Sequence, residues 1–129
     1  MKKYSDKHTW VILAKNRATI GLSSYAIEQL GEITFIELPN IGDSINQNDS
    51  AAFIESAKAA SDIYTPMGGK ITKINSNLKD SLEQLNEYPE DTWIFTVQIS
   101  DANEFDTLMD ELTYTIYTEK LKSKSWSFS

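Results

Sequence analysis

Lys58 is the side chain in this sequence whose type and setting point most directly to chemistry. It lies between Ala57 and Ala59, with Glu55 three residues before it and Asp62 four residues after it. The alanines leave the amine accessible, and the two acids are fixed marks that a lysine-modifying enzyme could read. An exposed lysine is most often only a solvated charge. Acylation would remove that charge. The inference that Lys58 is acylated therefore needs further evidence from the segments around it.

The segments on both sides of Lys58 have the composition of β-strands. Residues 51–54 (Ala-Ala-Phe-Ile) lead in, and residues 63–65 (Ile-Tyr-Thr) lead out before the turn-forming Pro and Gly residues of 66–69. We expect a hairpin with Lys58 at its tip. An acylated lysine there would be the root of a flexible arm, and a tethered group visits several active sites at high effective concentration without being released. The flanking alanines disfavour a biotin carrier, whose lysine normally lies between methionines.

Apolar patterns in the rest of the chain predict a mainly β domain with short helices. A helix is expected to begin after Ser23 or Ser24 and to stop at Gly31, and helical spacing recurs at residues 78–86. Glycine-centred turns before and after the lysine hairpin favour a small sandwich or a flattened barrel. Strand patterns occur at residues 9–15, 18–22, 33–38, 70–74 and 93–99.

The C-terminal region divides into two parts. A terminal helix with one apolar face is expected to start at Asp101 or Asn103. The Lys- and Ser-rich residues that follow it predict a flexible polar tail. We therefore expect a single domain over residues 1–117 and a tail over residues 118–129.

Composition restricts the possible classes of function. The chain has 129 residues, no cysteine, one histidine (His8) and a net charge of -7. Thiolate chemistry and cysteine-ligated metals are excluded, one histidine cannot build a multi-histidine metal site, and we predict no catalytic residues. The acidic charge disfavours nucleic-acid binding. We find neither an apolar run long enough for a membrane span nor a secretory signal, so a bacterial-type cytoplasm is the expected location.

Short motifs along most of the chain occur in an order typical of one family. The lysine segment reads Glu-Ser-Ala-Lys-Ala-Ala-Ser-Asp-Ile-Tyr at residues 55–64, and Ile-Gly-Asp precedes it at residues 41–43. From about Tyr4 to Tyr117 the chain resembles the glycine cleavage system H proteins. The other matching segments are residues 8–11, 20–22, 25–26, 30–32 and 35–39, with Pro66, Gly69, Asn75, Leu78, Asn86, Pro89 and Trp93.

This resemblance implies a fold, a cofactor and a role. The fold would be a barrel-sandwich hybrid, as in lipoyl domains, with a C-terminal helix. Lipoate would be attached covalently to Lys58 by a lipoate ligase or a lipoyl/octanoyl transferase, with Glu55 and Asp62 as the residues that this enzyme recognises. The chain would then be a non-catalytic lipoyl carrier in glycine catabolism, and we expect a monomer.

The resemblance also implies the partners of such a carrier. A pyridoxal-phosphate glycine decarboxylase would load the aminomethyl group of glycine onto the reduced arm. A tetrahydrofolate-dependent aminomethyltransferase would unload it, and dihydrolipoyl dehydrogenase would reoxidise the dithiol. The carrier tethers its cargo and shields it in a surface cleft, where Thr9 and Asp62 are the expected contacts.

Three departures from the family pattern affect this cleft and its rim. Thr9 replaces a glutamate and supplies no negative charge, residues 87–93 (Glu-Tyr-Pro-Glu-Asp-Thr-Trp) lack two glycines of the family's loop, and a glycine usual ahead of the lysine is absent. Drift within a working carrier explains these changes most simply. Two alternatives stay open: a lipoyl carrier for lipoate relay or for redox or stress signalling, and an H-like binding module without the modification.

Overall fold

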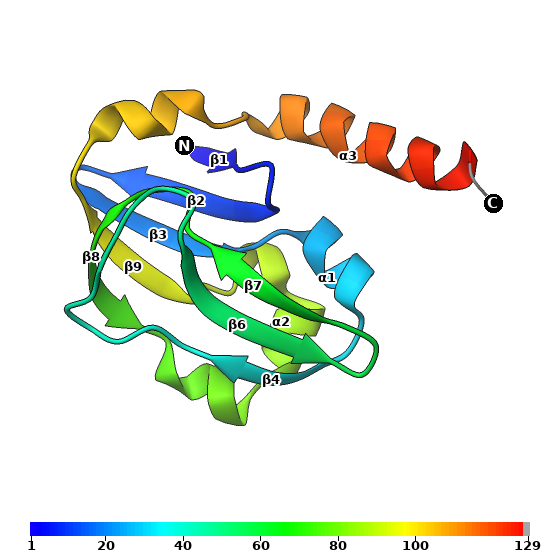
Figure 1. The fold of residues 1–129 in the computed structure, drawn as a ribbon, viewed down its shortest axis with the longest axis horizontal. Helices are drawn as coiled ribbons and strands as arrows, with labels where there is room; N and C mark the ends of the chain where they lie inside the picture. Colours follow the sequence, from blue (N-terminus) through cyan, green and yellow to red (C-terminus); the bar gives the residue numbers. More distant parts are fainter. Residues whose placement is uncertain (128–129) are drawn as a thin grey trace.

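Two antiparallel sheets face each other and form the body of the protein (Figure 1). The structure is a computed structural model that describes residues 1–127. Within these residues the larger sheet has the strand order β1-β2-β3-β9-β8-β5 and the smaller one the order β4-β6-β7. The sheets do not close into a barrel, and a C-terminal helix follows them. The prediction of a mainly β fold with short helices is confirmed.

The core lies between the two sheets. Because side chains alternate along a strand, each inner face presents every second residue. Val11 and Ile20 from the larger sheet and Ile36 and Ile54 from the smaller sheet are buried in one apolar cluster, and each contributes about 1.5–3 kcal/mol of transfer free energy. The strands are β1 (Lys2–Tyr4), β2 (Thr9–Ala14), β3 (Arg17–Leu22), β4 (Ile33–Glu37), β5 (Ser44–Ile45), β6 (Ser50–Ser56), β7 (Ala60–Tyr64), β8 (Gly69–Ile74) and β9 (Phe95–Ile99).

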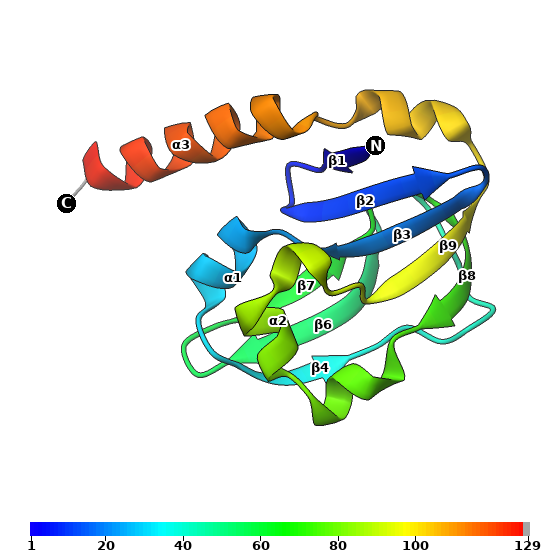
Figure 2. The same ribbon diagram turned by 180° about the vertical axis from the view of Figure 1, so that it is seen from behind.

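Short helices cover the ends of the sandwich. Helix α1 (Ser24–Leu30) begins where the Ser23 side chain accepts a hydrogen bond from the Ala26 amide, and it stops at Gly31, as predicted. Seen from behind, α1 and α2 lie at the same end of the molecule (Figure 2). No helix in the described part of the chain is both long and apolar enough to cross a membrane. The remaining short helices are η1 (Ser76–Asp80), α2 (Glu83–Glu87), η2 (Pro89–Asp91) and η3 (Ala102–Thr107).

The C-terminal region differs from the single helix expected after residue 101. A short helix, η3, ends at Thr107, and α3 (Glu111–Ser127) begins after an extended segment. In that segment Met109 exchanges two backbone hydrogen bonds with Tyr4, of 2.8 and 2.9 Å, which holds it out of a helical conformation. The boundary expected at residue 117 falls inside α3, whose backbone stays helical to Ser127.

Glu90 connects three parts of the chain that are distant in sequence. Its carboxylate accepts hydrogen bonds from the Lys2 ammonium (2.8 Å), the Tyr4 hydroxyl (2.6 Å) and the Ser24 amide (2.7 Å). Burial raises the pKa of this carboxyl, but the hydrogen bonds outweigh that effect and hold the pKa below its ordinary value of 4.5. The carboxylate thus joins β1 and η2 to the first turn of α1.

We expect Glu90→Gln to lower the free energy of unfolding by about 1–2 kcal/mol at neutral pH, because the amide lacks the charge that strengthens these hydrogen bonds. The folded-state pKa is depressed, so the wild-type contribution is complete above the unfolded-state pKa and is lost as the pH falls through the folded value. Urea unfolding from pH ~7 to ~2 measures this.

The exposed neighbour Asp91 provides the control, as Asp91→Asn. The stability difference between wild type and Glu90→Gln should shrink in acid. A difference that stays constant with pH, or one equal to that of the control, would contradict the role assigned to Glu90.

Candidate functional site

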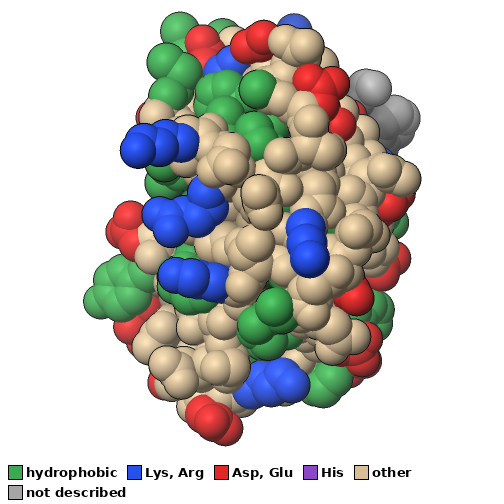
Figure 3. Space-filling model, turned by 90° about the vertical axis from the view of Figure 1, so that its left-hand side faces the viewer, with side chains coloured by type: hydrophobic (Ala, Val, Ile, Leu, Met, Phe, Trp, Pro, Cys, Tyr) green, Lys and Arg blue, Asp and Glu red, His purple; other side chains and the backbone are tan. Residues whose placement is uncertain are grey.

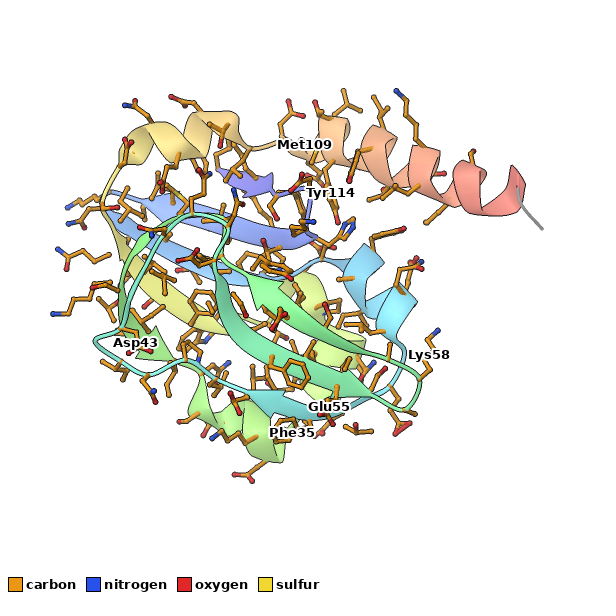
Figure 4. The ribbon with its side chains drawn as sticks, viewed as in Figure 1. Phe35, Asp43, Glu55, Lys58, Met109 and Tyr114 are labelled. Carbon is orange, nitrogen blue, oxygen red and sulfur yellow. The ribbon has the colours of Figure 1, made fainter. Side chains whose placement is uncertain are left out.

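Lys58 lies at the tip of the hairpin formed by β6 and β7. The strands pair through Glu55 with Ala60, and the turn is closed by the Ser56 amide, which donates to the Ala59 carbonyl at 2.8 Å. The Ser56 hydroxyl reinforces this turn, since it also lies 3.1 Å from the Ala59 amide. Ala57 and Lys58 are therefore the two loop residues, and the expected hairpin is observed. Figure 4 shows Lys58 at its outer end.

The stem of Lys58 lies over the end of α1. A Cβ atom built on Gly31 would lie 3.3 Å from Cε of Lys58. Gly31 has φ 80° and ψ -152°, a region essentially restricted to glycine. The carbonyl end of a helix also favours a nearby cation. Gly31 thus provides a bare backbone surface on which the lysine stem can rest.

The Asn86 side chain holds the backbone of Gly31 and Ile33 in place. Its side-chain amide donates to the Gly31 carbonyl at 2.9 Å and accepts from the Ile33 amide at 2.9 Å. Within the part of the chain that the structure describes, Lys58 forms no ion pair. The amine is exposed and is not committed to an acidic neighbour, while the segment beneath its stem is held at two points.

A cleft of about 220 Å³ lies between α1 and the lysine hairpin. Leu30, which lines the cleft, is adjacent in sequence to Gly31, which lies against the Lys58 stem; Lys58 itself is not part of the lining. Part of the lining is apolar, which suits an alkyl chain. The residues that line it are Lys7, His8, Leu22, Tyr25, Ala26, Gln29, Leu30, Ile54, Ser61 and Asp62.

His8 links this cleft to α3. Its Nδ1 atom lies 2.7 Å from the Tyr114 hydroxyl, which in turn lies 2.7 Å from the Ser23 hydroxyl. Burial lowers the pKa of His8, the nearby Lys7 adds to this effect, and Asp6 opposes it. The imidazole is therefore neutral at pH ~7. Lys7 and Asp62 are the charged side chains of the cleft lining, and they have opposite signs.

The structure brings three of the four predicted site residues together. Glu55 and Asp62 are exposed on the hairpin that carries Lys58, and Asp62 also lines the cleft, accepting from the Ser50 hydroxyl at 3.0 Å. Thr9 lies elsewhere, on β2. It is fully buried, lies 2.7 Å from the Ser5 hydroxyl and is not part of the cleft lining.

Sequence reasoning missed part of this site. It named His8 as the single histidine and Gly31 as a helix stop, and it placed neither near the lysine hairpin. Lys7 was also missed. No local pattern signals these roles, because each depends on contacts between segments more than 20 residues apart.

Comparisons with known proteins agree on one family. The family described as "Glycine cleavage H-protein" matches residues 2–121. The glycine cleavage system H protein of Thermotoga maritima is 41% identical over 115 residues, covering 88% of this chain and 93% of that protein. The mitochondrial H protein 2 of Arabidopsis thaliana is 40% identical, over 95% of this chain and 79% of its own length. A crystal structure of the H protein from Mycobacterium marinum has a TM-score of 0.83 at 26% identity and covers 92% of this chain and 96% of its own.

Replacing Gly31 tests whether the lysine stem rests on the end of α1. Gly31→Ala and Gly42→Ala should each destabilise the fold by about 1–3 kcal/mol, because both glycines have positive φ. Only the first adds a methyl group against Lys58, since nothing lies within 4 Å of a Cβ atom at Gly42. We expect the NMR signals of the Lys58 ε-methylene to shift in Gly31→Ala and not in Gly42→Ala. Unchanged signals in both variants would contradict this contact.

Proposed function

The chain belongs to the glycine cleavage H-protein family, and from this premise we propose that it is a lipoyl carrier of the glycine cleavage system. In this role it catalyses no bond change itself. Lipoate on Lys58 carries the aminomethyl group of glycine from glycine decarboxylase to aminomethyltransferase. Dihydrolipoyl dehydrogenase then restores the disulfide, and the cytoplasm is the proposed location.

The position of Lys58 is the observation that supports this proposal most strongly. Its amine stands at the end of a two-residue loop, and a cleft lies between its hairpin and α1. Among the described lysines only Lys2 and Lys122 form ion pairs, so the proposal rests on the place of Lys58 at the tip of the hairpin and not on its lack of an ion pair. An attachment lysine must reach the active site of another enzyme and then carry a group between catalysts.

Attachment requires only that Lys58 present its nitrogen. The neutral amine attacks the carbonyl carbon of an activated acyl group held by a lipoate ligase or a lipoyl/octanoyl transferase. The amide C–N bond forms, the bond to the leaving group breaks, and the leaving group departs with its electron pair. The nitrogen gives up its proton to the attaching enzyme or to solvent. Glu55 and Asp62 are the proposed marks that this enzyme recognises.

The cleft is the proposed shelter for the loaded arm. When bound, the lipoyl group supplies a dithiol that takes up and releases the aminomethyl group. Leu22, Ala26 and Leu30 exclude water from the alkyl part of the arm, and Asp62 offers the negative charge that a cationic amine needs. Thr9 stays a prediction, because contact with the cargo would require its buried hydrogen bond with Ser5 to open.

Replacement of Lys58 tests the attachment site. Incubation of the unmodified protein with a lipoate ligase, lipoate and ATP should add one lipoyl group, measured by intact mass. Lys58→Arg should abolish the increment and leave the fold unchanged, because arginine keeps the charge at an exposed loop but is not acylated. The exposed Lys73→Arg on β8 is the matched control and should be modified as wild type is. A full increment on Lys58→Arg would place the attachment elsewhere.

Replacement of Asp62 tests the shelter. Asp62→Asn should hasten the hydrolytic loss of the aminomethyl group from the loaded carrier by about threefold to tenfold, because it removes a carboxylate close to a cation. Ammonia release in the absence of aminomethyltransferase measures this loss. The exposed Asp106→Asn on η3 is the control. Equal rates for the two variants would contradict the role of Asp62, and failure of the wild type to load at all would favour lipoate relay.

A further inference from the structure

A β-bulge in β4 turns an aromatic side chain out of the core. Ile33 pairs with Ser56 and Phe35 with Glu55, so Thr34 is an extra residue between them. In a regular strand, Ile33 and Phe35 would share one face because they are two residues apart. The bulge breaks this alternation, so Phe35 faces outward while Ile33 and Ile36 both face the core. Ile33 and Ile36 are buried, at 4% and 2% exposure, whereas Phe35 is 45% exposed. The fold thus displays an aromatic ring on the outer face of β4.

The displayed ring belongs to a larger surface beside the lysine hairpin. Phe35 of β4 is paired with Glu55 of β6. Two residues further along the sheet, Glu37 of β4 is paired with Phe53 of β6, which is paired in turn with Asp62 of β7. Figure 4 shows Phe35 and Glu55 on the neighbouring strands β4 and β6. We call this surface the acidic sheet face, and it consists of Phe35, Glu37, Phe53, Glu55, Asp62 and Tyr64.

The carboxylates of the acidic sheet face, Glu37, Glu55 and Asp62, are not ion-paired in the described part of the chain. Two lysines come near this face: Lys7 lies 5.8 Å from the Tyr64 ring, and Lys79 borders a hollow beside Phe35. On the side of the molecule seen in Figure 3, Lys and Arg side chains stand among Asp and Glu side chains, and Arg17 and Lys70 flank Gln98 across three paired strands. The carboxylates that are not ion-paired on the acidic sheet face would attract a cationic partner surface to it.

We propose that the acidic sheet face, with Phe35 as its anchor, is the docking surface for the enzyme that acylates Lys58. This inference rests on the proposed function. The occupant is an enzyme surface with an apolar pocket for the Phe35 ring, flanked by Lys or Arg side chains that face Glu37 and Glu55. Aromatic anchors within a charged rim are the usual source of binding energy in such interfaces.

The distances along the hairpin suit a single enzyme surface. Glu55, which pairs with Phe35, precedes Lys58 by three residues, or about 10 Å of extended chain. An enzyme that binds Phe35 therefore also has the Lys58 amine close enough to enter its active site. A hollow of about 320 Å³ next to Phe35, bounded also by Lys79 and Leu82, leaves room for a side chain of the partner.

The test compares two exposed apolar residues on strands. Phe35→Thr removes the anchor, and Ile12→Thr is the matched control, since Ile12 is 40% exposed on β2 of the other sheet. Threonine retains strand propensity at both positions. Unmodified protein is titrated against a lipoate ligase with lipoate and ATP, and acylation is followed by intact mass. We expect Phe35→Thr to raise KM for the carrier about tenfold with kcat within about twofold, and Ile12→Thr to match wild type.

Direct binding provides a readout independent of turnover. The Lys58→Arg background cannot be acylated. In it, Phe35→Thr should raise the Kd for the ligase, measured by calorimetry, by the same roughly tenfold factor as KM, and Phe35→Tyr should bind as the Phe35 protein does. Glu37→Gln combined with Glu55→Gln should weaken binding mainly at low salt. The exposed pair Glu87→Gln and Glu111→Gln is the charge-matched control and should have no such effect.

The outcomes separate this inference from the proposed function. If wild type is acylated on Lys58 but Phe35→Thr behaves as Ile12→Thr does, the docking surface is wrong and the carrier proposal survives. If the wild-type lysine is not acylated at all, both fall. Equal salt dependence for the two glutamate pairs would overturn the assignment of a cationic partner.

Discussion

The register between β6 and β7 determines what this fold can present to a partner. Ile54 and Ile63 point into the core from these two strands, while Glu55 and Asp62 are exposed. A slip of one residue would reverse every one of these positions, burying two carboxylates and exposing two isoleucines. The core therefore fixes the register, and the register fixes the residue at which the hairpin turns. Lys58 stands at the tip because Ile54 and Ile63 are inside.

The segments around this tip are tied to the body by long-range contacts. Asn86 holds the backbone under the lysine stem, and Glu90 anchors the start of the same helix, α1, to β1. Tyr114 of α3 stacks on Tyr4 with ring centroids 4.4 Å apart and reaches His8 in the cleft wall. Each contact rigidifies the surface from which a swinging arm would depart, so mobility can be confined to the arm.

Local patterns were sufficient to predict the elements that carry the site. The strand runs around Lys58 and the stop at Gly31 are properties of a few neighbouring residues, and both are observed. The extended segment at Met109 and the bulge at Thr34 were not predicted, because strand pairing with distant residues creates them. Thr9 could be matched to a family position, but its burial against Ser5 depends on packing that one sequence does not display.

The central claim is that the exposed amine of Lys58 carries a covalently attached lipoyl arm. Peptide mass spectrometry of the protein isolated from its own cells, grown with ample lipoate, measures this directly. The account predicts that the peptide spanning residues 55–62 bears one lipoyl group on its lysine. A peptide that is unmodified throughout, from cells whose other lipoyl proteins are modified, would contradict it.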